Sequence, residues 1–156
     1  MRYGYVGLGN LGGHLAASLI RAGHELVVFD RDPALAARHR DMGASVAGSL
    51  AEVAERSDHV FTCLPSPAAS EAVLALLLTA MKPGATWIEN STLGRDDVLR
   101  LAGLARTGGV RMLEAPVTGG VHLAARGEIT VLAGGDADLF QMHRPALEAI
   151  GNRIFH

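Results

Sequence analysis

The 156-residue sequence is poor in cysteine, basic runs and long apolar runs, and each shortage narrows the class of protein. Cys63 is the single cysteine, so no disulfide can form within the chain, and we expect a reducing, cytoplasmic location. No apolar run reaches the roughly 18 residues of a membrane span, and the first expected strand begins too early for a signal peptide. Because the net charge is −2 and there is no basic run, we expect no nucleic-acid partner, and the lack of a long apolar run predicts no membrane partner.

Repeats, linkers and metal-binding spacings are also missing. The seven histidines show no His-x-x-x-His or comparable pattern, so we expect no metal site. Without a linker or repeat, residues 1–156 are expected to form one domain with a substantial core. Apolar residues make up 49% of the chain, which is typical of a sheet covered by helices on both faces.

The most informative stretch lies at the start of the chain. Gly7, Gly9 and Gly12 follow a short apolar strand at G-x-G-x-x-G spacing, and an apolar-periodic helix comes next. The first glycine makes a tight turn, the second lets a pyrophosphate approach the backbone, and the third lets helix and strand pack closely. N–H groups at the helix start favour an anion. We therefore predict a dinucleotide-binding segment, Gly7-Leu8-Gly9-Asn10-Leu11-Gly12, with a ligand-free glycine turn as the alternative.

Asp30 ends the second expected strand, 18 residues after Gly12, close to the spacing of about 20 expected for the acid that binds the adenosine ribose. Its carboxylate would accept hydrogen bonds from the ribose hydroxyls and repel a 2′-phosphate. Arg31 acts in the opposite sense, because arginine can clamp a phosphate, or it is simply a solvated loop cation. We expect NAD as the cofactor, with NADP as the alternative.

Short apolar strands alternate with helical patterns along the whole chain. Strands are expected at 3–6, 24–30, 44–46, 58–63, 85–89, 110–114, 128–133 and 153–155, and helices at 11–20, 34–42, 50–57, 70–81, 95–106 and 136–150, with a loop and short helix over 115–126. This alternation predicts a Rossmann-like α/β fold, with a doubly wound, mostly parallel sheet and helices on both faces. Ligands of such sheets bind outside the carboxyl ends of the strands.

Three further stretches follow expected strands. Cys63 begins a turn predicted to line the cofactor groove, although a lone cysteine is more often a small apolar filler. Ser91 and Thr92 either contact the nicotinamide side or cap the next helix. The stretch Thr118-Gly119-Gly120 suits a carboxylate through its hydroxyl and exposed N–H groups, but Gly-Gly also makes ordinary turns. His122 beside it is interpreted as a surface loop histidine.

Five stretches together resemble the β-hydroxyacid dehydrogenases, the family of 3-hydroxyisobutyrate dehydrogenase, tartronate semialdehyde reductase and 6-phosphogluconate dehydrogenase. The resemblance covers essentially the whole chain. The matching stretches are Gly7-Leu-Gly-Asn-Leu-Gly12, Cys63-Leu-Pro65, Glu89-Asn-Ser-Thr92, Glu114-Ala-Pro-Val-Thr-Gly-Gly120 with Gly127, and Gly134-Gly135-Asp136.

The resemblance implies hydride transfer between NAD(P) and a small β-hydroxyacid or its semialdehyde. It implies that the glycine segment holds the pyrophosphate, that Leu64, Pro65 and Thr92 approach the nicotinamide ribose and ring, and that Thr118, Gly119 and Gly120 hold the substrate carboxylate. Four residues depart from the family pattern and bear on the substrate more than on the cofactor: Glu114, Thr118, Leu123 and Glu128.

The family's general acid/base is a lysine on a helix beyond this region. Lys82 is the only lysine here and precedes a strand, which puts it at the opposite edge of the sheet from the cofactor. The resemblance therefore implies no catalytic residue within residues 1–156. It also implies a longer two-domain, homo-oligomeric enzyme whose all-helical second domain is absent, and apolar patches around 115–126 and 140–156 that favour self-association.

Two alternatives remain open from the sequence. A non-catalytic dinucleotide-sensing module would use the same glycines and Asp30 without a lysine. An imine-reductase-like domain would share the fold and cofactor, but it would usually lack the Thr118-Gly119-Gly120 pattern.

Overall fold

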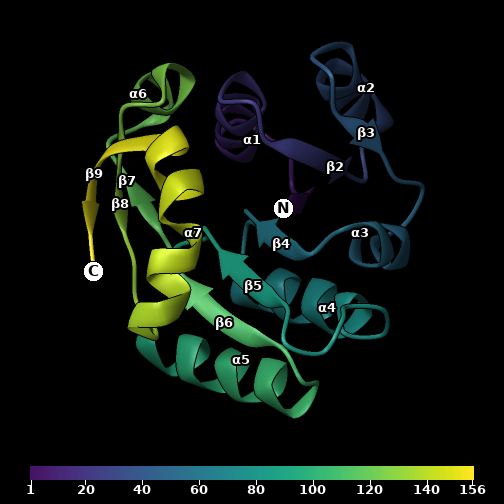
Figure 1. Cartoon of the computed structure of the whole chain (residues 1–156), viewed down its shortest axis with the longest axis vertical. Helices are drawn as coiled ribbons and strands as arrows, with labels where there is room; N and C mark the ends of the chain where they lie inside the picture. Colours follow the sequence, from purple (N-terminus) through teal and green to yellow (C-terminus); the bar gives the residue numbers. More distant parts are fainter.

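Residues 1–156 of the computed structural model form two sheets and seven helices (Figure 1). The main sheet has six strands in the order β3-β2-β1-β4-β5-β6, and every neighbouring pair is parallel. Its strands are β1 (Arg2–Val6), β2 (Glu25–Phe29), β3 (Ser45–Val46), β4 (His59–Thr62), β5 (Thr86–Glu89) and β6 (Arg111–Glu114). The strand order reverses between β1 and β4, which places a ligand crevice at their carboxyl ends.

Helices cover both faces of this sheet, because successive residues of each buried strand point to opposite sides. One face carries Tyr5 and Phe61, whose rings stack, and packs against α1 (Gly12–Arg21), α2 (Pro33–Asp41) and α7 (Ala137–Ile150). The other carries Val60 and Trp87 and packs against α3 (Leu50–Arg56), α4 (Pro67–Leu77) and α5 (Arg95–Thr107). The predicted doubly wound, Rossmann-like α/β fold is confirmed.

The last strands do not extend the main sheet. They form a second sheet in the order β7-β8-β9, with β7 (Val117–Thr118) antiparallel to β8 (Ile129–Leu132) and β9 (Gly151–Phe155) parallel to β8. Buried Ile129 and Val131 join this sheet to the core that contains α7, and α6 (Val121–Arg126) connects β7 to β8. Figure 1 shows the small sheet in green and yellow at one side, beyond α7. The two-residue strand β7 was missed, because its pairing with β8 depends on residues distant in sequence.

Helix caps explain where the element boundaries differ from the expected ones. The fourth helix begins at Pro67 rather than at position 70, because Ser66 accepts a hydrogen bond from the Ala69 N–H at 3.2 Å and proline suits the first helical position. Ser49 caps the start of α3, with its Oγ accepting from the Glu52 N–H at 3.1 Å. None of the seven helices combines the length and apolar character needed to cross a membrane.

Candidate dinucleotide site

A cleft of about 640 Å³ opens where β1 and β4 end. Ten of the twelve residues predicted to bind the cofactor line it: Gly7, Gly9, Asn10, Leu11, Gly12, Asp30, Arg31, Cys63, Leu64 and Pro65. The other two do not. The Leu8 side chain is buried in the core, and Thr92 is exposed outside the cleft lining. The far end of the cleft is apolar and lies against α3 and α4, through Leu50, Val73 and Leu76 among others.

The three glycines of the motif differ in what surrounds them. Gly7 adopts a φ of +93°, and a side chain there would overlap the Cys63 carbonyl oxygen. A Cβ on Gly12 would overlap the Gly7 carbonyl oxygen and lie 2.9 Å from the Cys63 Cβ. A Cβ on Gly9 would meet no atom within 4 Å. Gly7 and Gly12 therefore permit close backbone packing, whereas Gly9 faces the open cleft.

Four consecutive backbone N–H groups at the start of α1 have no acceptor in the protein. They belong to Gly9, Asn10, Leu11 and Gly12, whereas the next one, from Gly13, donates to the Gly9 carbonyl at 2.9 Å. Unpaired N–H groups at a helix start carry the positive end of the helix dipole and suit a phosphate or another anion. This part of the cleft is thus an anion cradle made of backbone alone.

Asp30 connects the cradle to the end of β2. Its Oδ2 accepts a hydrogen bond from the Leu8 N–H at 2.7 Å, and its Oδ1 accepts from the Asp32 N–H at 2.8 Å. Each carboxylate oxygen can accept a further hydrogen bond, so these contacts leave room for ligand hydroxyls. Sequence reasoning assigned Asp30 only to the ribose. Its second task, bracing the glycine loop and the start of α2, depends on the parallel pairing of β1 with β2.

The turn after β4 is fixed by a buried polar network. The Leu64 N–H donates to the Ser91 Oγ at 2.7 Å, and the Ser91 N–H and hydroxyl both donate to the Glu89 Oε1. Burial raises the pKa of the Glu89 carboxyl. Burial also raises the pKa of the Cys63 thiol to about 12, with the Glu89 charge adding to the effect. Cys63 is therefore a neutral wall of the cleft rather than a reactive thiolate.

The two hydroxyls after β5 have different environments. Ser91 is buried and fully engaged by Glu89 and Leu64, so it is a structural residue rather than a ligand contact. Thr92 is exposed. The capping alternative was wrong for both residues, because α5 begins after Gly94.

The stretch predicted to hold a carboxylate lies between β7 and α6. Thr118, Gly119 and Gly120 are exposed, and the two glycines have φ angles of +126° and +87°. Neither glycine donates its N–H to another protein group. None of the three lines the 640 Å³ cleft. His122 is exposed, as expected.

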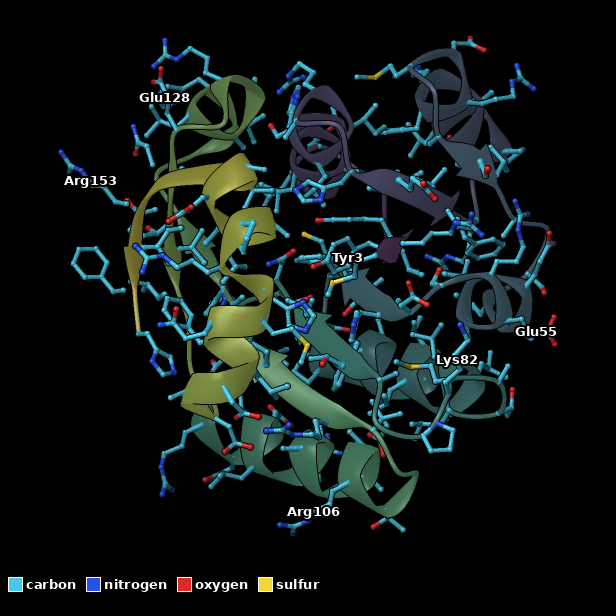
Figure 2. All side chains as sticks on the ribbon, in the orientation of Figure 1. Tyr3, Glu55, Lys82, Arg106, Glu128 and Arg153 are labelled. Carbon is cyan, nitrogen blue, oxygen red and sulfur yellow. The ribbon has the colours of Figure 1, made fainter.

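Lys82 (Figure 2) lies at the amino edge of the sheet. Its Nζ donates to the Asp58 Oδ1 at 3.1 Å, just before β4 begins, and Asp58 also accepts from the Arg2 N–H at the start of β1. The dinucleotide cleft lies at the carboxyl ends of these strands. Lys82 is therefore outside the site, as its position in the sequence predicted.

The parallel sheet reverses its strand order between β1 and β4, and the backbone anion cradle lies at this point with Asp30 at the end of β2. These features together define the class of dinucleotide-binding α/β proteins. The sequence profile described as the NAD binding domain of 6-phosphogluconate dehydrogenase matches residues 2–156. The chain belongs to this family and is an NAD-binding domain.

Similar proteins include dehydrogenases of small hydroxyacids. The chain is 35% identical over 156 residues to a probable mitochondrial 3-hydroxyisobutyrate dehydrogenase of Dictyostelium discoideum, covering 98% of this chain and 49% of that protein. It is 37% identical over 158 residues to an NAD-dependent L-serine dehydrogenase of Pseudomonas aeruginosa, covering 97% and 52%. A Mycobacterium tuberculosis 3-hydroxyisobutyrate dehydrogenase solved with L-serine superposes with a TM-score of 0.96 at 33% identity, covering 99% and 53%. The chain spans about half the length of the curated relatives it matches.

Proposed function

We propose that this chain is the cofactor-binding half of an oxidoreductase that transfers hydride between NAD and a small β-hydroxyacid or its semialdehyde. The observation that carries the proposal is the backbone anion cradle with Asp30 beside it. The names of the similar proteins, which include 3-hydroxyisobutyrate and L-serine dehydrogenases, support the substrate class.

In this proposal the cofactor lies along the cleft between β1 and β4. The free N–H groups of residues 9–12 bind the pyrophosphate, and Asp30 accepts from the adenosine ribose hydroxyls. Leu64, Pro65 and Thr92 contact the nicotinamide ribose and ring. A bound nicotinamide would accept or donate the hydride at its C4. The neutral Cys63 thiol and the apolar walls keep water from that end of the groove.

NAD rather than NADP is the preferred cofactor in this proposal. The 2′-hydroxyl of NAD would donate to the Asp30 carboxylate, whereas a 2′-phosphate would bring two more negative charges against it. A hydrogen bond to a charged acceptor contributes about 1.5–3 kcal/mol. Arg31 beside Asp30 is the one cation in the cleft lining. In this proposal its guanidinium contacts the adenine or a phosphate.

The substrate carboxylate is proposed to bind at Thr118, Gly119 and Gly120, whose hydroxyl and unpaired N–H groups face solvent. No residue of the chain is proposed as the general acid/base, because Lys82 lies at the opposite edge of the sheet. We therefore expect cofactor binding but little or no turnover from residues 1–156 alone. We also propose that the whole enzyme is cytoplasmic and homo-oligomeric.

Calorimetric titration of the chain with NADH and with NADPH tests this proposal. We expect tighter binding of NADH, and an affinity lost by about tenfold or more in Asp30→Asn, which removes the charge and retains the shape. Asp41→Asn is the matched control, because Asp41 is exposed at the other end of α2 and contacts only Arg40. Tighter binding of NADPH would contradict the assigned cofactor preference, and no binding of either would contradict the site.

A further inference from the structure

Asn90 is a buried asparagine at the end of β5, only 1% exposed. Its Oδ1 accepts a hydrogen bond from the Tyr5 hydroxyl of β1 at 3.2 Å, and its Nδ2 donates to the Ala115 carbonyl oxygen, just after β6, at 2.8 Å. A buried amide is costly unless its polar atoms are paired, and here both are. The Asn90 side chain therefore connects β1 with the segment that leaves β6.

The partners of the Asn90 amide fix its orientation. A carbonyl oxygen only accepts hydrogen bonds, so the amide nitrogen must face Ala115. The amide oxygen then faces Tyr5, whose hydroxyl is the donor. Burial raises the pKa of the Tyr5 hydroxyl well above its ordinary value, so this donor keeps its hydrogen. Each of the two contacts thus holds the amide in the orientation that the other one needs.

The backbone of Asn90 belongs to the wall of the cofactor cleft. Its N–H donates to the Thr62 carbonyl oxygen at 2.8 Å, at the end of β4. The next residue, Ser91, accepts from the N–H of Leu64, which lines the cleft. One end of the Asn90 contact is therefore fixed to the turn that the nicotinamide would approach.

The other end of the contact lies at the start of the stretch proposed to hold the substrate carboxylate. Asn90 is the only side chain that hydrogen-bonds residues 115–120. Beyond Ala115 the backbone takes over, because the Pro116 carbonyl oxygen accepts from the Leu132 N–H at 2.9 Å and β7 pairs with β8. Asn90 is thus the one side-chain connection between the main sheet and this stretch.

We propose that Asn90 is a positioning residue that, together with the Tyr5 hydroxyl, holds residues 118–120 in a fixed place relative to the nicotinamide end of the cofactor cleft. This inference rests on the proposed function. Hydride transfer requires the substrate carbon to lie close to the nicotinamide C4, so the stretch that binds the carboxylate must keep its place beside the cleft. Loss of either hydrogen bond releases the backbone at Ala115 and lets that stretch move.

The first measurement needs no ligand and compares backbone amide NMR signals of residues 118–120. We expect these signals to shift in Asn90→Leu, which fills similar space without a donor, and in Tyr5→Phe, which keeps the ring and so guards against misfolding of the first variant. Tyr3→Phe is the matched control, because Tyr3 is also a buried tyrosine of β1 but its hydroxyl contacts His143 instead. Signals of residues 118–120 that are the same in Tyr5→Phe and Tyr3→Phe would overturn the proposal.

The second measurement titrates β-hydroxypropionate, a small β-hydroxyacid, into the NADH-bound chain and follows the same signals. We expect Tyr5→Phe and Asn90→Leu to bind the acid about fivefold or more weakly, with the NADH affinity by calorimetry unchanged. A merely destabilising substitution would not separate the two ligands in this way. Equal acid affinity in Tyr5→Phe and the unmodified chain would overturn the proposal.

Failure of the proposed function would look different. If the unmodified chain binds NADH but residues 118–120 do not respond to the acid, the assigned carboxylate site is wrong. The ligand-free comparison of Tyr5→Phe with Tyr3→Phe still decides whether Asn90 and Tyr5 hold this stretch in place.

Discussion

Acidification should destabilise this fold through one buried histidine. His143 on α7 is fully buried, and its Nδ1 lies 3.0 Å from the Tyr3 hydroxyl of β1, which Figure 2 labels near the centre of the molecule. Its ring stands edge-on to that of His59 at 4.5 Å between centroids, and its Nε2 has no partner. Burial, followed by the neighbouring His59, lowers the pKa of His143 from 6.5 to about 3.

Proton linkage gives the direction and the size of this change in folding stability. Above pH 6.5 the ring is neutral in both states, so His143 adds no pH dependence. Below it, the unfolded chain takes up a proton that the folded chain refuses until about pH 3, and folding stability falls through that window. The loss is about 2 kcal/mol at pH 5 and about 3 kcal/mol at pH 4. Burial also lowers the pKa of His59, which adds to the loss in the same direction.

Urea unfolding of the chain at about pH 7 and pH 5 measures this loss. His143→Gln, which does not titrate, should be less stable at neutral pH because it disturbs the Tyr3 contact, yet it should lose much less stability on acidification. His122→Gln removes an exposed histidine and should behave like the unmodified chain. An equal acid loss in His143→Gln and the unmodified chain would refute the reasoning.

Three further predictions concern the cleft and its support. Gly12→Ala should destabilise the chain by more than about 3 kcal/mol, because its Cβ would overlap the backbone. Gly9→Ala should unfold at the same temperature as the unmodified chain but bind NAD more weakly, because its Cβ would point into the open cleft. Similar unfolding temperatures of the two variants would contradict this difference. Cys63 should react with a thiol reagent at pH 8 far more slowly than free cysteine, since burial raises its pKa to about 12, and fast labelling of the folded chain would be inconsistent with that environment. Ser91→Ala should lower the free energy of unfolding in urea by about 1–3 kcal/mol, because the buried Ser91 hydroxyl bonds Glu89 and Leu64. Thr92→Ala should leave the free energy of unfolding almost unchanged, because Thr92 is exposed. Equal losses in the two variants would contradict the assignment of Ser91 to this network.

The sequence determined the fold class and located most residues of the cleft lining, because both depend on local patterns. Strand and helix periods, with Gly7, Gly9 and Gly12 between β1 and α1, predicted the parallel sheet and the position of the cleft beside the glycine segment. Spacing alone singled out Asp30, which lines this cleft. These signals need only the backbone requirements of short stretches, which residues close in sequence report directly.

Only the tertiary structure decided which polar groups are already engaged. Ser91 and Thr92 are neighbours with the same chemistry, yet packing buries one hydroxyl in the Glu89 network and exposes the other. The second sheet pairs residues 12 or more positions apart, and the His39 ring on α2 contacts the Gly13 carbonyl oxygen on α1. Such partners follow from how the elements pack in three dimensions, and no local sequence pattern encodes them.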